Sequence, residues 1–400
     1  FAVPVFTLRT GNPLMSGRAR FCLGMCFDFI PISSYTALFN WTILFLILGA
    51  VYQAGTGGIY SSSTTRLDSL AGFLFVVALI LYMGARPVSP EFGDTINYAA
   101  EFQHLQQEEE GNWKAQLTGM KGEWLFAVIL HAWVQHGNVH DYFLTCSAVY
   151  VGALALASYR IFGARWFIPF LVACAMFTFW VYGVNGVRNG MAASVMILGL
   201  TFRNNLKMML LCAVLAASLH KSMMLLAAAG ACAWFVTDTR YYVAGWVGSI
   251  LAVILAGPAI GEMIASSGFF DDPRLTLYIN QADELKASSP LFSSVGFRWD
   301  FLIYSALPIA TGCYFLFREE YRDVMYTWLL NIYIAANAFW ILCMYAAFSN
   351  RFAQLSWFLM GFVFIYPFFK QRFWADQEKK LACFIPVIYA FTFYMNIYNA

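Results

Sequence analysis

Charged residues are scarce in this chain, and their scarcity decides the class of protein. Only 12% of its 400 residues are Asp, Glu, Lys or Arg, whereas an ordinary soluble domain carries about 25%. Hydrophobic residues make up 60% of the sequence, and the mean hydropathy is +0.62. These values exclude an ordinary soluble domain and indicate a protein that crosses a membrane several times.

The sequence also lacks the short motifs of nucleotide and metal chemistry. It contains no P-loop, no dinucleotide-binding glycine fingerprint and no HExxH helix. The acidic pair Asp271 and Asp272 has no credible second metal ligand. Most of the nine cysteines fall inside apolar runs, where a thiol packs as a small apolar group. We therefore expect no metal, no cofactor and no nucleic-acid partner.

Long apolar runs divide the chain into candidate membrane spans. At about 20 residues per crossing, the chain could hold roughly a dozen helices, and continuous rather than alternating runs exclude a β-barrel. The predicted spans are 35–54, 70–85, 142–159, 166–182, 190–202, 206–219, 223–236, 241–256, 301–317, 324–348, 352–369 and 381–398. The run 124–134 is too short to cross and is predicted to be re-entrant. The expected fold is one all-α polytopic domain, 1–400, with about 11–13 transmembrane or re-entrant helices.

Basic turns predict the orientation of these spans. Lys and Arg are concentrated in the loop 370–380 and in the turns at 160–165, 202–207 and 318–322. Because cytoplasmic loops carry an excess of Lys and Arg, we expect these turns in the cytoplasm. Crossing parity then places two long segments outside, a first outer loop at 86–123 and a second at 257–298. Their mix of aromatic residues, proline and charges favours ordered loops.

Three arginines on the predicted outer face suggest a site for an anion. Arg188, Arg298 and Arg351 each begin an apolar helix. A guanidinium keeps its charge and offers forked donors to phosphate oxygens, so these arginines could form a cup for a diphosphate. The alternative is that each extends to the membrane interface or pairs with a carboxylate such as Asp300.

Two further residues could transfer a proton. His220 ends a helix of small residues, AVLAASLHKS, and a group that titrates near neutrality could accept a proton from a sugar hydroxyl. A structural histidine is the alternative. Asp94, in GDTINY, could be the base or hold a sugar, or it could only cap the helix that begins near Thr95. Tyr98 could stack on a sugar ring. These residues predict a membrane-embedded enzyme with an anionic, lipid-linked substrate.

Four sequence motifs occur in an order that resembles a known family. They are ARPVSPEFGDTINYAAEF, NGVRNGMAASVMILGL, AASLHKSMMLLAA and SNRFAQLSWF. This order resembles the EpsG-like branch of bacterial polysaccharide polymerases, which include O-antigen and capsule polymerases of the Wzy type. The family pattern has an Arg, a short gap, Gly-Asp-Thr and a Tyr, then an Arg-Asn or Arg-Gln, then a His-x-Ser and a late Arg.

The resemblance implies a helical bundle like that of the GT-C glycosyltransferases, with its active site at the periplasmic face of the bacterial inner membrane. Such enzymes transfer a glycan from polyprenyl diphosphate to the non-reducing end of another lipid-linked unit. Three arginines would hold the diphosphate, namely Arg188, Arg298 and Arg351, and Arg86 would also bind the substrate. His220 or, failing that, Asp94 would deprotonate the acceptor hydroxyl. Tyr98 and Asp300 would position the sugar or an arginine.

The implied partners are the lipid bilayer, the polyprenyl-diphosphate-linked oligosaccharide, a chain-length regulator and a flippase. Two other functions stay open. One is an O-antigen ligase or another polyprenyl-phosphate-dependent glycosyltransferase, which would use the same diphosphate cup. The other is a transporter or flippase of lipid-linked oligosaccharide, which should show internal repeats with interrupted helices near the midplane. The sequence contains no convincing repeat.

Overall fold

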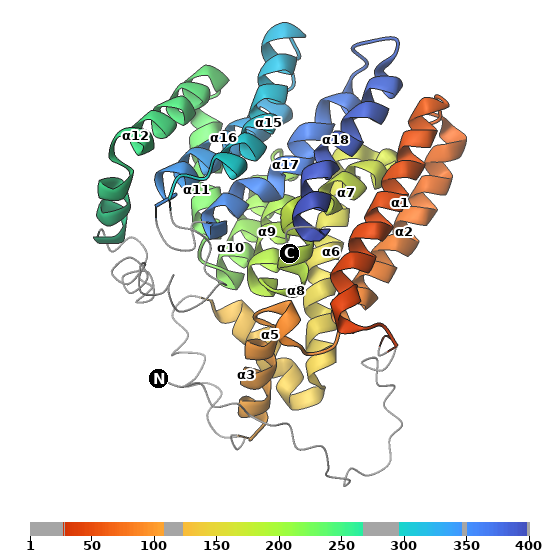
Figure 1. Cartoon of the computed structure of the whole chain (residues 1–400), viewed down its shortest axis with the longest axis vertical. Coiled ribbons are helices and arrows are strands. Elements are labelled where there is room, and N and C mark those ends of the chain that lie inside the picture. The colour runs from red at the N-terminus through yellow and green to blue at the C-terminus, as the bar shows by residue number, and fades with distance from the viewer. Residues whose placement is uncertain (1–26, 28, 108–122, 267–295, 346–349, 398–400) are drawn as a thin grey trace.

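The fold is a bundle of apolar helices (Figure 1). The computed structural model describes residues 27, 29–107, 123–266, 296–345 and 350–397. Among these residues, eight helices are long and apolar enough to cross a membrane, or nine with one bent pair. They belong to α1 (Tyr35–Gly55), α2 (Ser62–Gly84), α6 (Val139–Phe162), α12 (Thr239–Ser266), α15 (Trp299–Cys313), α16 (Val324–Leu342), α17 (Asn350–Lys370) and α18 (Gln377–Ile397). The predicted all-α polytopic membrane fold is confirmed.

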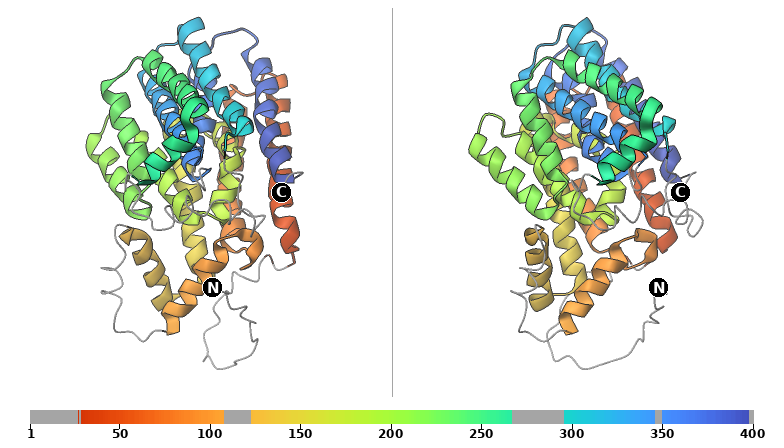
Figure 2. Two further views of the ribbon diagram at one scale, coloured as in Figure 1. Left: turned by 60° about the vertical axis from the view of Figure 1, so that its left-hand side comes forward. Right: turned by 90° about the vertical axis from the view of Figure 1, so that its left-hand side faces the viewer.

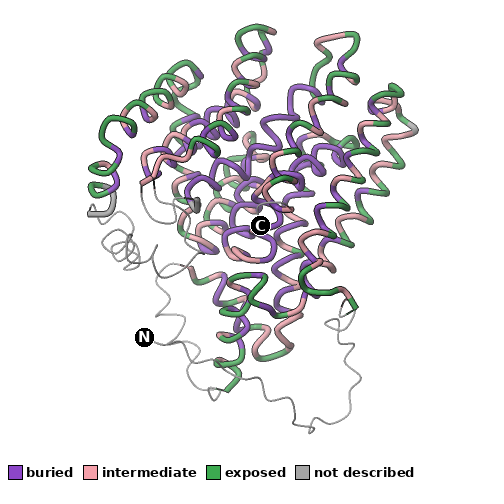
Figure 3. Tube along the Cα trace, viewed as in Figure 1, coloured by how far each residue is buried: buried purple, intermediate pink, exposed green. Residues whose placement is uncertain are grey.

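Helix α17 lies at the centre of the bundle. All of its apolar stretch is buried, whereas α1, α2, α12 and α18 are buried over a third of theirs or less. Figure 3 shows the same gradient from a buried centre to exposed outer helices. Because the exposed residues of these outer helices are mostly apolar, they suit contact with lipid rather than with water.

Three shorter helices follow one another beside α6 and α17. They are α9 (Val187–Leu200), α10 (Leu206–Leu219) and α11 (Met223–Phe235). The longest of them have 14 residues and are about 21 Å long, less than the hydrocarbon thickness of about 30 Å. The sequence predicted α10 with the same bounds. Two more helices, α3 (Thr95–Gln107) and α5 (Trp124–His136), lie beyond the bundle at one end (Figures 1 and 2).

The predicted span 166–182 is not one continuous helix. This segment forms two short helices, α7 (Phe167–Cys174) and α8 (Phe177–Val184), bent by 74° relative to each other. Met176 between them is extended, with φ −74° and ψ 145°. The backbone N–H of Phe177 donates to the Tyr304 hydroxyl at 3.3 Å. A side chain from a distant helix therefore satisfies a donor that the helix break exposes.

The second outer loop is predicted to start at residue 257, directly after an interruption of α12. Helix α12 continues to Ser266 after an interruption at Ala256, where φ is −145°. Pro258 lies in the first turn after the interruption, where its missing N–H removes no helical hydrogen bond. The rest of that loop, 267–295, and residues 108–122 of the first outer loop lie outside the described residues. The predicted re-entrant run is α5, which packs against α3, α6 and α10.

Basic turns and sequence motifs occupy opposite ends of the bundle. Helix α9 begins beside Arg188 and leads to the turn that contains Arg203. At that second end the Lys370 ammonium donates to the Ile161 carbonyl, so α6 and α17 finish together there. We call the end that carries Arg188 the motif end. The end that carries Arg203 and Lys370 is the basic end.

Candidate functional site

The Gly-Asp-Thr motif is docked onto the junction between α8 and α9. Gly93 has a φ of +54°, and a Cβ at this position would lie 2.5 Å from the Asn185 side chain. The next backbone N–H, that of Asp94, donates to Asn185 Oδ1 at 2.9 Å. A side chain at position 93 would prevent this approach, so the glycine is required by both its backbone angle and its contact.

Arg86 and Thr95 fasten the same junction from inside the protein. Arg86 Nη2 donates to Thr95 Oγ1 at 3.0 Å and to the Val184 carbonyl at 3.1 Å. Thr95 Oγ1 donates to that carbonyl at 2.6 Å, and the guanidinium lies 4.4 Å from the Phe143 ring centroid. Burial lowers the pKa of Arg86 to about 10, so it is still cationic at neutral pH. Its side chain is 0% exposed, which fits a positioning residue and not the predicted contact with substrate.

Glu123 is the centre of the polar cluster at the motif end. Its Oε2 lies 2.8 Å from Arg188 Nη1, and its Oε1 accepts from the Lys221 backbone N–H at 3.2 Å. The same Oε1 lies 3.7 Å from His220 Nδ1. One carboxylate thus connects α5, the start of α9 and the turn between α10 and α11. Sequence reasoning missed this residue because it resembled the other acids of the first outer loop.

The contacts of His220 define which ring nitrogen carries the proton. The backbone N–H of Ser222 donates to His220 Nδ1 at 3.2 Å, and the Ser222 hydroxyl lies 3.0 Å from the same nitrogen. A ring nitrogen that accepts a hydrogen bond is unprotonated, so the neutral ring carries its proton on Nε2. In this tautomer Nδ1 is the ring nitrogen that could take up a proton, and the role of His220 as base stays a prediction.

Tyr98 and Asp94 complete the cluster. Tyr98 is buried, and its ring centroid lies 5.7 Å from that of Phe126, which also faces the Arg188 guanidinium at 5.4 Å. Burial raises the pKa of Tyr98 to about 12, with a smaller lowering by Arg188 and a smaller raising by Asp94. The phenol is therefore neutral and packs on Phe126. Asp94 is half-buried, and its Oδ1 accepts from Asn97 Nδ2 at 3.1 Å.

Arg298 and Asp300 form a two-pronged ion pair at the start of α15. Arg298 Nε lies 2.9 Å from Asp300 Oδ1 and Nη2 lies 2.6 Å from Oδ2. The Arg298 backbone N–H contacts Met344 Sδ at 3.1 Å, just beyond the end of α16 and therefore at the motif end. Pairing with a carboxylate such as Asp300 is the alternative to diphosphate binding that the sequence analysis left open. Arg351 lies in the first turn of α17, and its side chain lies outside the described residues.

The structure thus brings together Asp94, Tyr98, Arg188 and His220, with Glu123 between the last two. In the part of the chain that the structure describes, no three His, Cys, Asp or Glu side chains come together as they would around a metal ion.

Comparison with known protein families identifies the family to which the chain belongs. The family model of the EpsG family matches residues 71–400, which include every residue of the cluster described above. No curated protein and no solved structure matches the chain.

Proposed function

Since the chain belongs to the EpsG family, we propose that it is a polysaccharide polymerase that uses lipid-linked repeat units. It would transfer a glycan from polyprenyl diphosphate to the non-reducing end of another lipid-linked unit. A multi-pass helical bundle suits this chemistry because the polyprenyl chains of both substrates stay in the bilayer. We further propose that the motif end faces the periplasm of a bacterial inner membrane, since the basic turns lie at the other end.

The single observation that carries the proposal is the state of Arg188. Its side chain is 37% exposed and lies in the cluster that also contains Asp94, Tyr98 and His220. These are side chains that can exchange protons with sugar hydroxyls or contact sugar rings. Glu123 engages Nη1, while Nε has no hydrogen-bond partner among the described residues. A guanidinium has five N–H donors, so several remain for phosphate oxygens. Arg298 and Arg351 would complete the diphosphate site from α15 and α17.

The reaction would proceed by attack of the acceptor hydroxyl on the anomeric carbon of the donor glycan. A new C–O bond forms as the bond between that carbon and the diphosphate oxygen breaks, and the diphosphate leaves on its lipid. Negative charge grows on the leaving oxygen, so preorganised donors such as Arg188 stabilise the transition state more than the bound substrate. The hydroxyl proton would go to His220 or, failing that, to Asp94.

A reconstituted assay with a purified lipid-linked repeat unit tests the proposal. Arg188→Ala should lower polymer formation by about 100-fold or more, because one preorganised donor in an active site contributes at that level. Arg188→Lys should retain part of the activity, since it keeps the charge but loses the fork. Arg240→Ala, at the basic end, is the matched control. Polymer of normal length and rate from Arg188→Ala would refute the proposal.

A further inference from the structure

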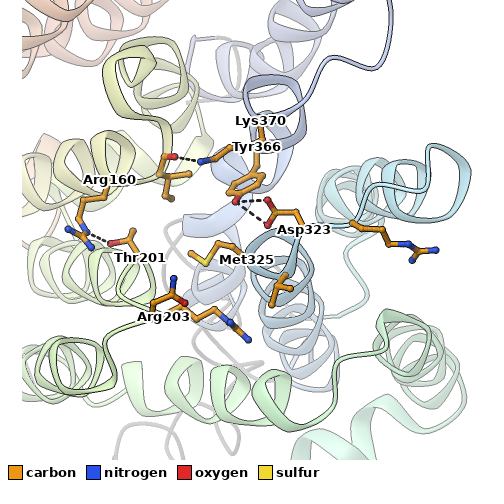
Figure 4. A pocket seen from close by; sticks show the side chains of 11 residues that line it. Arg160, Thr201, Arg203, Asp323, Met325, Tyr366 and Lys370 are labelled. Carbon is orange, nitrogen blue, oxygen red and sulfur yellow. Dashed lines mark hydrogen bonds between the residues drawn. The ribbon is translucent and has the colours of Figure 1, made fainter.

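A cavity of about 420 Å³ opens at the basic end, whereas the cluster around Glu123 lies at the motif end. Figure 4 shows side chains that line this cavity. It forms where α6, the turn between α9 and α10, the start of α16 and the end of α17 meet. Four basic side chains line it, namely Arg160, Arg203, Arg322 and Lys370. Among the described residues that line the cavity, the only acid is Asp323, so four positive charges minus one negative charge leave a formal charge of +3.

The basic side chains are held in place by uncharged groups. Arg160 Nε donates to Thr201 Oγ1 at 2.9 Å, and its guanidinium lies 3.6 Å from the Phe202 ring centroid. The Arg203 guanidinium lies 4.5 Å from the Trp234 ring centroid. Its Nε is buried and has no hydrogen-bond partner among the described residues. An unsatisfied buried donor on a cation is costly unless a ligand occupies it.

Asp323 offsets one of these positive charges without forming an ion pair, because other donors occupy its oxygens. Oδ1 accepts from the Tyr326 backbone N–H at 2.8 Å and so caps α16. The Tyr366 hydroxyl lies 3.2 Å from both oxygens, and the Tyr321 hydroxyl donates to Oδ2 at 3.1 Å. Between Asp323 and the basic lining residues, all of which the structure describes, there is no ion pair within 4.0 Å. Figure 4 shows Tyr366 and Asp323 joined to each other across one wall of the cavity.

We propose that this cavity is a binding site for a phosphate-bearing anion, separate from the site of glycan transfer. Arg160, Arg203 and Lys370 come from three different segments of the chain, and their convergence requires the folded protein. A phosphate or diphosphate group matches their charge and the forked donors of the two arginines. The group belongs either to an anionic lipid, whose headgroup lies at the level where spanning helices end, or to a soluble phosphate compound.

The ordinary explanation for this charge is orientation alone, since basic turns keep one face in the cytoplasm. Membrane orientation requires only that basic residues lie on the cytoplasmic side. It does not require that they converge on a cavity or that Arg203 keeps an unsatisfied donor. The two explanations therefore differ in one measurable property, which is whether the charges act together on one ligand or separately.

Binding measurements on the intact protein in nanodiscs test the proposal without any turnover. One arm adds inorganic diphosphate to protein in phosphatidylcholine nanodiscs. The other arm compares phosphatidylcholine nanodiscs with ones that contain phosphatidic acid. The readout in both is the midpoint of thermal unfolding, because a ligand that binds the folded state raises it. The variants are Arg203→Gln and Arg160→Gln, and the control is Arg240→Gln, which removes the same charge at the same end outside the cavity.

We expect saturable stabilisation in at least one arm and a loss of affinity of about tenfold in each cavity variant, equivalent to about 1.4 kcal/mol. Stabilisation by diphosphate alone assigns the site to a soluble compound, and stabilisation by phosphatidic acid assigns it to a lipid headgroup. Arg160→Gln keeps the test valid if Arg203→Gln loses its packing on Trp234 and unfolds. The proposal is overturned if neither arm stabilises the protein, or if Arg240→Gln weakens binding as much as the cavity variants.

Discussion

Replacement of Glu123 by Gln is the sharpest test of the cluster at the motif end. The change keeps the shape of the side chain and removes its charge. Glu123 now accepts from two donors, Arg188 Nη1 through Oε2 and the Lys221 backbone N–H through Oε1. A glutamine amide has only one oxygen. One of the two donors would therefore lose its acceptor and face an NH₂ group.

The structure limits the expected loss of stability. The side chains of Arg188 and Glu123 are 37% and 21% exposed, so water and salt screen the pair in part. An exposed ion pair contributes up to about 1 kcal/mol, and a hydrogen bond to a charged group about 1.5–3 kcal/mol when it is well shielded. We expect Glu123→Gln to lower the free energy of unfolding by about 1 kcal/mol. The folded bundle should survive this loss.

Turnover should fall much more than stability. Glu123 sets the direction of Arg188 and holds the turn that carries His220, and a displacement of about 1 Å in an active site can cost about 100-fold in rate. We expect kcat for polymer formation to fall by about 10-fold to 100-fold. Because Glu123 does not itself hold the substrate, KM should change less.

The assay uses purified protein and a lipid-linked repeat unit, with polymer length and initial rate as readouts. Glu91→Gln is the matched control, since Glu91 is an exposed acid on the same side of the molecule. Glu123→Asp should give an intermediate rate. If Glu123→Gln polymerises at the wild-type rate while its unfolding midpoint is unchanged, then this carboxylate does not organise the site.

Two further predictions concern the contact between Arg86 and Thr95 and the orientation of the bundle in the membrane. Thr95→Val should lower the free energy of unfolding by about 1–3 kcal/mol, because Arg86 loses its side-chain acceptor inside the protein. Denaturant titration measures this change, and an unchanged unfolding midpoint would contradict the prediction. A cysteine at Gln106, on exposed α3, should react with an impermeant thiol reagent added outside spheroplasts whose outer membrane has been removed, in a background without native cysteines. A cysteine at Lys379, exposed at the basic end, should react only after permeabilisation, and the opposite result would reverse the orientation.

Helices whose ends have local signals could be predicted from the sequence. Helix α10 is the clearest case, since both of its predicted ends are correct. Asn205 accepts from the Met208 backbone N–H and caps its start, and His220 at its end has an extended backbone. Polar residues next to an apolar run are visible in the sequence, so the boundaries required no knowledge of the fold.

Features that depend on distant contacts could not be predicted. The break between α7 and α8 lies inside a continuous apolar run, and the hydroxyl that satisfies its backbone comes from Tyr304, 127 residues further along. Glu123 is a similar case, because its partners Arg188 and Lys221 are 65 and 98 residues away in sequence. In both cases the sequence contains the residues but not the fold that brings them together.

The Gly-Asp-Thr motif shows why the sequence could predict a candidate site but not divide its residues by role. Gly93 lies close to the Asn185 side chain and Thr95 is buried, and both residues hold the turn against α8 and α9. Asp94 between them is half-buried, and its carboxylate accepts a hydrogen bond from Asn97. Neighbouring residues in one turn can have different roles. The spacing of a sequence motif does not distinguish these roles. Burial separates Thr95 from Asp94. We therefore expect substitution of Thr95 to change stability and substitution of Asp94 to change turnover.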